Sequence, residues 1–104
     1  MDNKVIWKYQ IIDGYNKKTD LRIPVNSKLL HIGIQSKIIM VWFEVDKEEV
    51  NNIETRTFYS FLTGSSFNSN DLEYRKTIIF HDTYVVHIYE KRREEFLTNN
   101  DMII

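Results

Sequence analysis

The sequence predicts an all-β fold, mainly antiparallel, with about seven strands arranged as a small sandwich or an open barrel. Short apolar or alternating segments recur along the chain, and turn residues separate them. The composition favours strands as well, because six Phe and six Tyr stand beside three Gly, one Pro and no Ala. No repeat or Pro/Gly/Ser-rich linker divides the 104 residues, so we expect a single domain over 1–104. The final segment, 91–104, is charged and then apolar, and it suits at most a short helix.

The first two expected strands are separated by a polar turn. Residues 13–20 begin with an Asp-Gly turn pair. Pro24 cannot donate a hydrogen bond to a neighbouring strand, so it should end a short strand over 21–25 or lie at the edge of a sheet. The strand before the turn covers 4–12, and alternation places four of its apolar side chains on one face: Val5, Trp7, Tyr9 and Ile11.

The segment LLHIGIQSKIIMVWFEV, residues 29–45, predicts a hairpin that is apolar on both faces. A two-residue loop at Ser36-Lys37 would fix the pairing of its strands, although Ser-Lys is a poor type I′ pair and a longer loop stays open. One face then carries only apolar pairs and should face the core: Ile34–Ile39, Ile32–Val41 and Leu30–Phe43. The opposite face mixes polar and apolar side chains: Gln35–Ile38, Gly33–Met40, His31–Trp42 and Leu29–Glu44.

The rest of the chain supplies the remaining strands. Residues 46–54 are polar and allow one helical turn, and 55–62 then read as a strand. Residues 63–71 are rich in Ser, Asn and Gly and predict a long flexible loop. A second hairpin is expected from strands over 73–80 and 83–91, with its turn at 81–83.

Charge and composition exclude several classes of protein. The net charge is −1, from 14 basic and 15 acidic residues, which lacks the basic footprint of general nucleic-acid binding. There is no Cys, so disulfides and Cys-based zinc sites are excluded and a reducing compartment is expected. No apolar run has the ~18 residues of a membrane span, and the first residues lack signal-peptide features. A protein surface on which single-stranded nucleic acid stacks normally includes a positively charged groove, and this chain lacks the charge for one. The aromatic residues that could form such a surface are Trp7, Tyr9, Trp42 and Phe58.

Catalytic and metal-binding patterns are weak. The chain has no Gly-x-Ser-x-Gly elbow, no Walker loop and no Gly-x-Gly-x-x-Gly. His31 or His87 could act as a base, but a lone His on a strand is more often structural. A metal at His81 and His87 would need a third ligand such as Asp82, without the usual spacing. We therefore expect a protein that is not an enzyme, with no catalytic residue, no metal and no cofactor.

Two sets of residues suggest a ligand. Trp42 could stack on a nucleotide base, Gln35 could hydrogen-bond its edge, and Gly33 leaves room for a ring. The small residues after 62 could offer backbone amides to an anion, with charge supplied by Arg56, or by Arg75 or Lys76. The predicted ligand-binding residues are His31, Gln35, Trp42, Arg56, Thr63, Gly64 and Ser65.

The second apolar face of the hairpin also suggests association. Ile38, Met40 and Trp42 would be an aggregation hazard if they were exposed on a monomer. Burial against another copy removes that hazard, and Trp and Met are favoured at interfaces. We therefore expect a homo-oligomer whose interface contains these three residues.

Five blocks, in this order, resemble a family of short accessory proteins of tailed bacteriophages: VIWKYQI, IPVNSKLLHIGIQ, VWFEVD, ETRTFYSFLTG and YVVHIYE. The chain departs from the family pattern where His-Pro often follows Thr-Gly, since Ser65 and Ser66 stand there. The resemblance implies a phage accessory protein in the bacterial host cytoplasm. By analogy of class, we expect it to counter host defence by binding a nucleotide-type signal or a host defence protein. The alternative is a structural or assembly protein of the phage without a small ligand.

Overall fold

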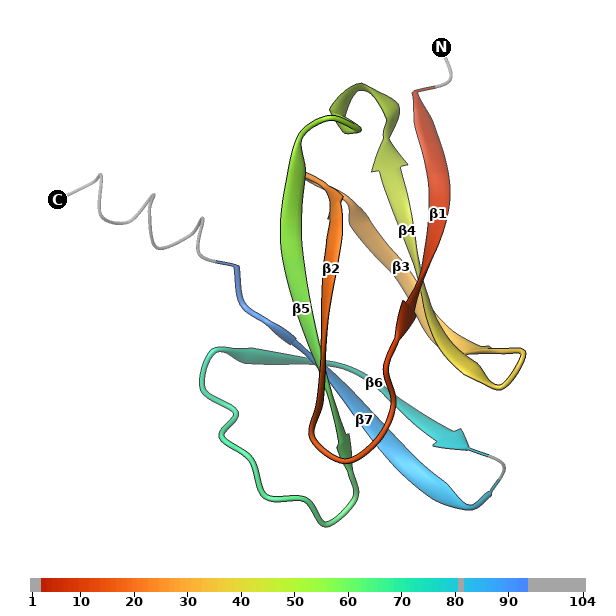
Figure 1. Cartoon of the computed structure of the whole chain (residues 1–104), viewed down its shortest axis with the longest axis vertical. Helices are drawn as coiled ribbons and strands as arrows, with labels where there is room; N and C mark the ends of the chain where they lie inside the picture. The colour runs from red at the N-terminus through yellow and green to blue at the C-terminus, as the bar shows by residue number, and fades with distance from the viewer. Residues whose placement is uncertain (1–2, 81, 94–104) are drawn as a thin grey trace, which may run out of the picture.

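The computed structural model describes residues 3–80 and 82–93, which form seven antiparallel strands in two sheets (Figure 1). One sheet has three strands in the order β1-β4-β3, and the other has four in the order β2-β5-β7-β6. The predicted all-β fold is confirmed as a small sandwich and not as a barrel. The strands are β1 (Lys4–Ile11), β2 (Lys17–Pro24), β3 (Lys28–Gln35), β4 (Ile38–Asp46), β5 (Ile53–Leu62), β6 (Leu72–Phe80) and β7 (Tyr84–Lys91).

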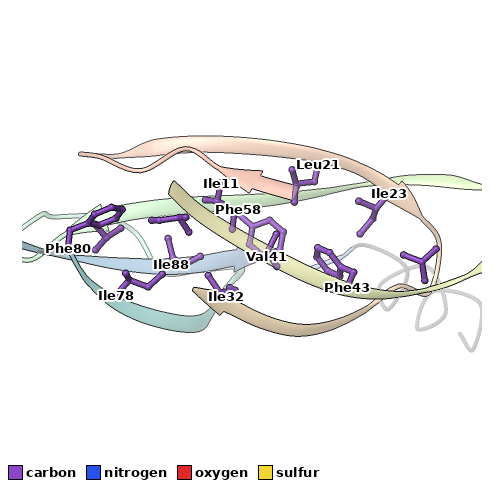
Figure 2. Packing of buried hydrophobic residues seen from close by; sticks show 13 residues of the cluster. Ile11, Leu21, Ile23, Ile32, Val41, Phe43, Phe58, Ile78, Phe80 and Ile88 are labelled. Atoms are coloured by element: carbon purple, nitrogen blue, oxygen red, sulfur yellow. The ribbon is translucent and has the colours of Figure 1, made fainter. Parts of the chain in front are cut away.

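The core lies between the two sheets, and alternation along each strand fills it. Figure 2 shows labelled apolar side chains from both sheets pointing into this space. Phe43 of β4 and Phe58 of β5 meet across it with ring centroids 6.3 Å apart, and neither is exposed. The predicted inner face of β1 is confirmed in part, because Ile11 is buried and Val5 and Tyr9 pack against the core. Trp7, on the same face, remains 38% exposed.

The β3–β4 hairpin has the predicted two-residue loop. Ser36 and Lys37 both adopt positive φ, 53° and 66°, as a type I′ turn requires. The predicted pairs are therefore confirmed from the turn as far as His31–Trp42. A bulge at Leu30 then shifts the register, so Leu29 pairs with Phe43, and the predicted partners of Leu29 and Leu30 are wrong.

Strand β2 begins earlier than its sequence suggests. Its first half, Lys17 to Asp20, was expected to belong to the loop, but it pairs with β5. Thr19 points inward and its Oγ1 accepts a hydrogen bond from the amide of Ile12 at 2.9 Å. The charged residues point away from the core, which is typical of an edge strand. Pro24 ends the strand as predicted.

The helical content of the described residues is a single 3-10 turn, Lys47–Glu49, within the segment expected to hold one helical turn. The side chain of Asp46 caps it by accepting from the amide of Glu48 at 2.9 Å. No helix in the described part of the chain is long and apolar enough to cross a membrane. The expected short helix after residue 93 falls outside the described residues.

Candidate functional site

The outer face of the three-stranded sheet carries the first predicted ligand residues. In the register of the sheet, Trp42 lies between Lys8 of β1 and His31 of β3. The His31 and Trp42 rings are in contact, with centroids 5.7 Å apart and a tilt of 41°. Met40 and Ile38 continue the row along β4 and are half-buried. The structure therefore brings together the hairpin residues that were predicted to share this face.

The space predicted for a ligand ring above Gly33 is filled by the protein itself. A Cβ added to Gly33 would lie 2.6 Å from His31 Nε2, so the imidazole rests on the glycine backbone. Gln35 is also engaged, because its Oε1 accepts a hydrogen bond from Lys8 Nζ at 2.7 Å. The side chains of this face contact one another. The face is therefore better suited to the flat surface of a partner than to a small molecule.

Thr63, Gly64 and Ser65 lie at the end of β5 in the other sheet, so the predicted ligand set is divided between two sheets. Two amides of the expected anion nest already have partners: Thr63 N donates to Val85 O at 3.2 Å, and Ser65 N donates to Leu62 O at 3.0 Å. Gly64 has a φ of 95°, which the turn into the following loop requires. The geometry favours a role in starting this loop.

Arg56 lies in the core and not at the surface. Its Nε and Nη2 donate to the Glu90 carboxylate at 2.6 and 3.0 Å, and its Nη1 donates to Ser27 O at 2.6 Å. The guanidinium also lies 4.8 Å from the centroid of Phe43. Arg75 also contacts this carboxylate, with its Nη2 2.9 Å from Glu90 Oε1. The predicted phosphate contact of Arg56 does not fit this position, because every edge of the group is committed inside the protein.

A hollow of about 460 Å³ lies on the outer face of the four-stranded sheet. Its floor is aromatic: Phe67 of the loop stacks on Phe61 of β5 with centroids 3.9 Å apart, and Tyr59 lies beside Phe61, nearly parallel to it at 6.2 Å. Tyr89 of β7 meets Phe67 edge-on at 5.1 Å and supports it. We call this the aromatic hollow, and it is lined by Asn16, Tyr59, Phe61, Ser66, Phe67, Asn68, Asn70, Asp71, Leu72 and Lys91.

Hydrogen bonds hold the loop that walls the aromatic hollow. Thr63 Oγ1 lies 2.8 Å from His87 Nε2, and Thr77 Oγ1 lies 3.0 Å from His87 Nδ1. This series of hydrogen bonds continues to Tyr74, whose hydroxyl is 2.6 Å from Thr77 Oγ1. Both nitrogens of His87 are therefore bonded to hydroxyls, and none of these partners is an acid that could orient a catalytic base. The role this geometry gives His87 is to anchor the loop.

The opposite wall, at the β1–β2 turn, is also fixed. Ser60 Oγ lies 3.0 Å from Ile12 O and 3.2 Å from Gly14 O. Tyr84 Oη donates to Asp13 Oδ2 at 2.7 Å, and this hydrogen bond raises the pKa of the Tyr84 phenol above its usual value. Asn16, which lines the hollow, follows directly in the same turn. Hydrogen bonds within the protein thus hold both walls of the hollow in place without a ligand.

One residue in the sequence indicates this site. Phe67 is a lone large apolar residue in a segment of Ser, Asn and Gly, and such a side chain needs a surface to pack on. The loop was instead expected to be flexible. No group of three His, Cys, Asp or Glu that could hold a metal ion occurs among residues 3–80 and 82–93. The alternative of His81, His87 and Asp82 is not tested by this finding. His81 lies outside that part.

One family matches almost the whole chain. It is described as a domain of unknown function (DUF7352), and it covers residues 2–98. The chain belongs to this family. No curated protein and no solved structure matches the chain. The description of the DUF7352 family names no ligand.

Proposed function

We propose that this DUF7352 protein acts by binding, without catalysing a reaction, and that its ligand is a nucleotide-type molecule. The aromatic hollow carries the proposal. Its volume falls in the range of small-molecule sites, roughly 300–1,000 Å³. Tyr59 and Phe67 offer ring faces for stacking, and the amides of Asn16, Asn68 and Asn70 offer both donors and acceptors for the edge of a base.

The biological setting of the proposal comes from the resemblance to phage accessory proteins. In that setting the protein captures a nucleotide signal of the bacterial host's defence, in the host cytoplasm. Such a sponge needs affinity and a preformed site, and it needs no catalytic group. The two fixed walls of the aromatic hollow are consistent with this requirement.

Native mass spectrometry on the full chain, purified from bacteria with active defence signalling, tests the proposal. We expect the wild type to carry the extra mass of a nucleotide. Phe67→Ala should weaken binding of that molecule about 10- to 100-fold, as loss of one stacking contact would. Ile79→Ala is the matched control, because Ile79 is an exposed apolar residue of the same sheet that does not line the hollow. Wild-type protein that is always free of ligand, or Phe67→Ala protein with unchanged affinity, would contradict the proposal.

A second candidate function is association through the outer face of the three-stranded sheet. The row Trp42, Met40 and Ile38 is half-buried in the monomer, and Ile6 on the neighbouring strand is 61% exposed. A homo-oligomer, a host defence protein or a phage assembly partner would each cover this row.

Sedimentation velocity distinguishes these cases. If copies associate through this face, Trp42→Lys should convert an oligomer to a monomer, because a desolvated charge opposes burial. Ile79→Lys, on the other sheet, should leave the oligomer unchanged. A wild-type protein that stays monomeric at tens of micromolar would rule out self-association and leave only the partner proteins.

A further inference from the structure

A second, smaller hollow of about 190 Å³ lies where β7 ends. It is lined by Glu73, Arg75, Glu90, Lys91, Arg92 and Arg93, and we call it the basic groove. Lys91 lines both hollows. The register places Glu73 and Glu90 on the inner face of the four-stranded sheet and the aromatic hollow on its outer face, so a ligand that reaches both must pass around the end of β7 at Lys91.

The two hollows differ in charge. The aromatic hollow is lined by one acidic and one basic residue, Asp71 and Lys91. The basic groove has four cationic side chains and two glutamates. Glu90 is paired with Arg56 from inside, Arg75 with Glu73 and Arg93 with Glu54, so Lys91 and Arg92 supply the excess positive charge of the groove. The groove therefore favours an anion.

Within the part of the chain that the structure describes, no close ion pair holds Lys91 or Arg92. The side chain of Arg92 is 64% exposed, and its Nε lies 3.9 Å from Glu73 Oε1. Its backbone is fixed, since Arg92 N donates to Asp71 O at 2.7 Å, at the rim of the aromatic hollow. Lys91 is exposed and has no ion pair among the described residues. Arg75 is less mobile, because Glu73 and Glu90 both hold its guanidinium.

We infer that the basic groove is the phosphate half of the same site, so that the ligand class is a nucleoside phosphate and not a free base or nucleoside. The ring stacks in the aromatic hollow beside Tyr59 and Phe67. The phosphate lies against Lys91 and Arg92, where Arg92 can present two N–H groups to two oxygens. This inference rests on the proposed function and adds the anionic part of the ligand.

Isothermal titration calorimetry on the full chain tests this inference. The ligands are the four common ribonucleosides and their 5′-diphosphates. At least one diphosphate should bind about 10- to 100-fold tighter than its nucleoside, as expected for one or two charge-assisted hydrogen bonds. The difference should shrink at high salt. It should also be lost in Lys91→Met/Arg92→Met, while Lys47→Met, an exposed lysine distant in sequence and on the 3-10 turn, should change nothing.

The outcomes separate the two claims. Equal affinity for nucleoside and diphosphate, or a difference that Lys91→Met/Arg92→Met leaves intact, would overturn the phosphate half and leave ring binding in place. If neither compound of any pair binds, both claims fail. If diphosphates bind but Phe67→Ala has no effect, the groove binds anions by itself, and both the joined site and the aromatic hollow's role are overturned.

Discussion

Replacing Arg56 by methionine should lower the free energy of unfolding by about 3 kcal/mol, the lower end of what breaking a buried ion pair costs. Arg56 and Glu90 have side-chain exposures of 5% and 2%, so solvent cannot compensate for the lost partner. Glu90 would keep Arg75 at 2.9 Å, which limits the loss. Ser27 O would lose its donor as well. Urea unfolding, monitored by tryptophan fluorescence, measures the difference in the free energy of unfolding between the variant and the wild type.

Two comparisons show whether the buried charge is the cause. Arg75→Met should cost less, about 1 kcal/mol, because Glu90 keeps its bidentate partner and Arg75 is partly exposed. Arg56→Met/Glu90→Leu should recover much of the stability, since apolar side chains of similar volume replace buried pairs at little cost. An Arg56→Met protein as stable as the wild type would show that the pair adds nothing.

Truncating Phe43 to alanine should cost about 3–5 kcal/mol, as for other fully buried phenylalanines. Phe43 is the ring on which the two layers meet: it touches Tyr9 edge-on at 5.9 Å, Phe58 at 6.3 Å and the Arg56 guanidinium at 4.8 Å. A domain of this size has only about 5–15 kcal/mol of net stability, so the variant should be near the limit of folding. Thermal unfolding by circular dichroism measures the loss.

Phe43→Leu keeps most of the volume and should cost less than about 1.5 kcal/mol. Trp42→Ala, one residue away but on the outer face, should cost less than half of the Phe43→Ala effect. Because Phe43 and Arg56 are in contact, their combined substitution should also be less damaging than the sum of the two single losses. Additive losses, or a Trp42→Ala variant as unstable as Phe43→Ala, would contradict this description of the core.

The hairpin shows which parts of the fold the sequence determines. A two-residue loop fixes the register, and alternation then identifies the core face, so the pairs up to His31–Trp42 could be predicted. The bulge at Leu30 could not. Leu29 and Leu30 are chemically identical, so hydropathy cannot indicate which of them leaves the ladder.

In the candidate site, several residues are placed by contacts that local sequence patterns do not predict. The sequence pattern suggests that Arg56 is a cation at the surface, but its burial depends on Glu90, 34 residues further along the chain. The hairpin register predicted that His31, Gln35 and Trp42 share a face, but strand order places Thr63 after a strand of the other sheet. The aromatic hollow depends on Phe67 folding back onto β5, a long-range contact that no local periodicity predicts.

The bulge in β3, together with a second bulge in β6, affects how copies of this chain can meet. Both lie on edge strands, at Leu30 in β3 and at Arg75 in β6, and each interrupts the row of backbone groups that an incoming strand would need. The other two edge strands carry residues that oppose pairing with an incoming strand. These are lysines on β1, and lysines, Arg22 and the terminal Pro24 on β2. Continuous strand addition, the route to fibres, is therefore opposed at all four edge strands. Contacts between copies are more favourable at the two outer sheet faces than at the strand edges.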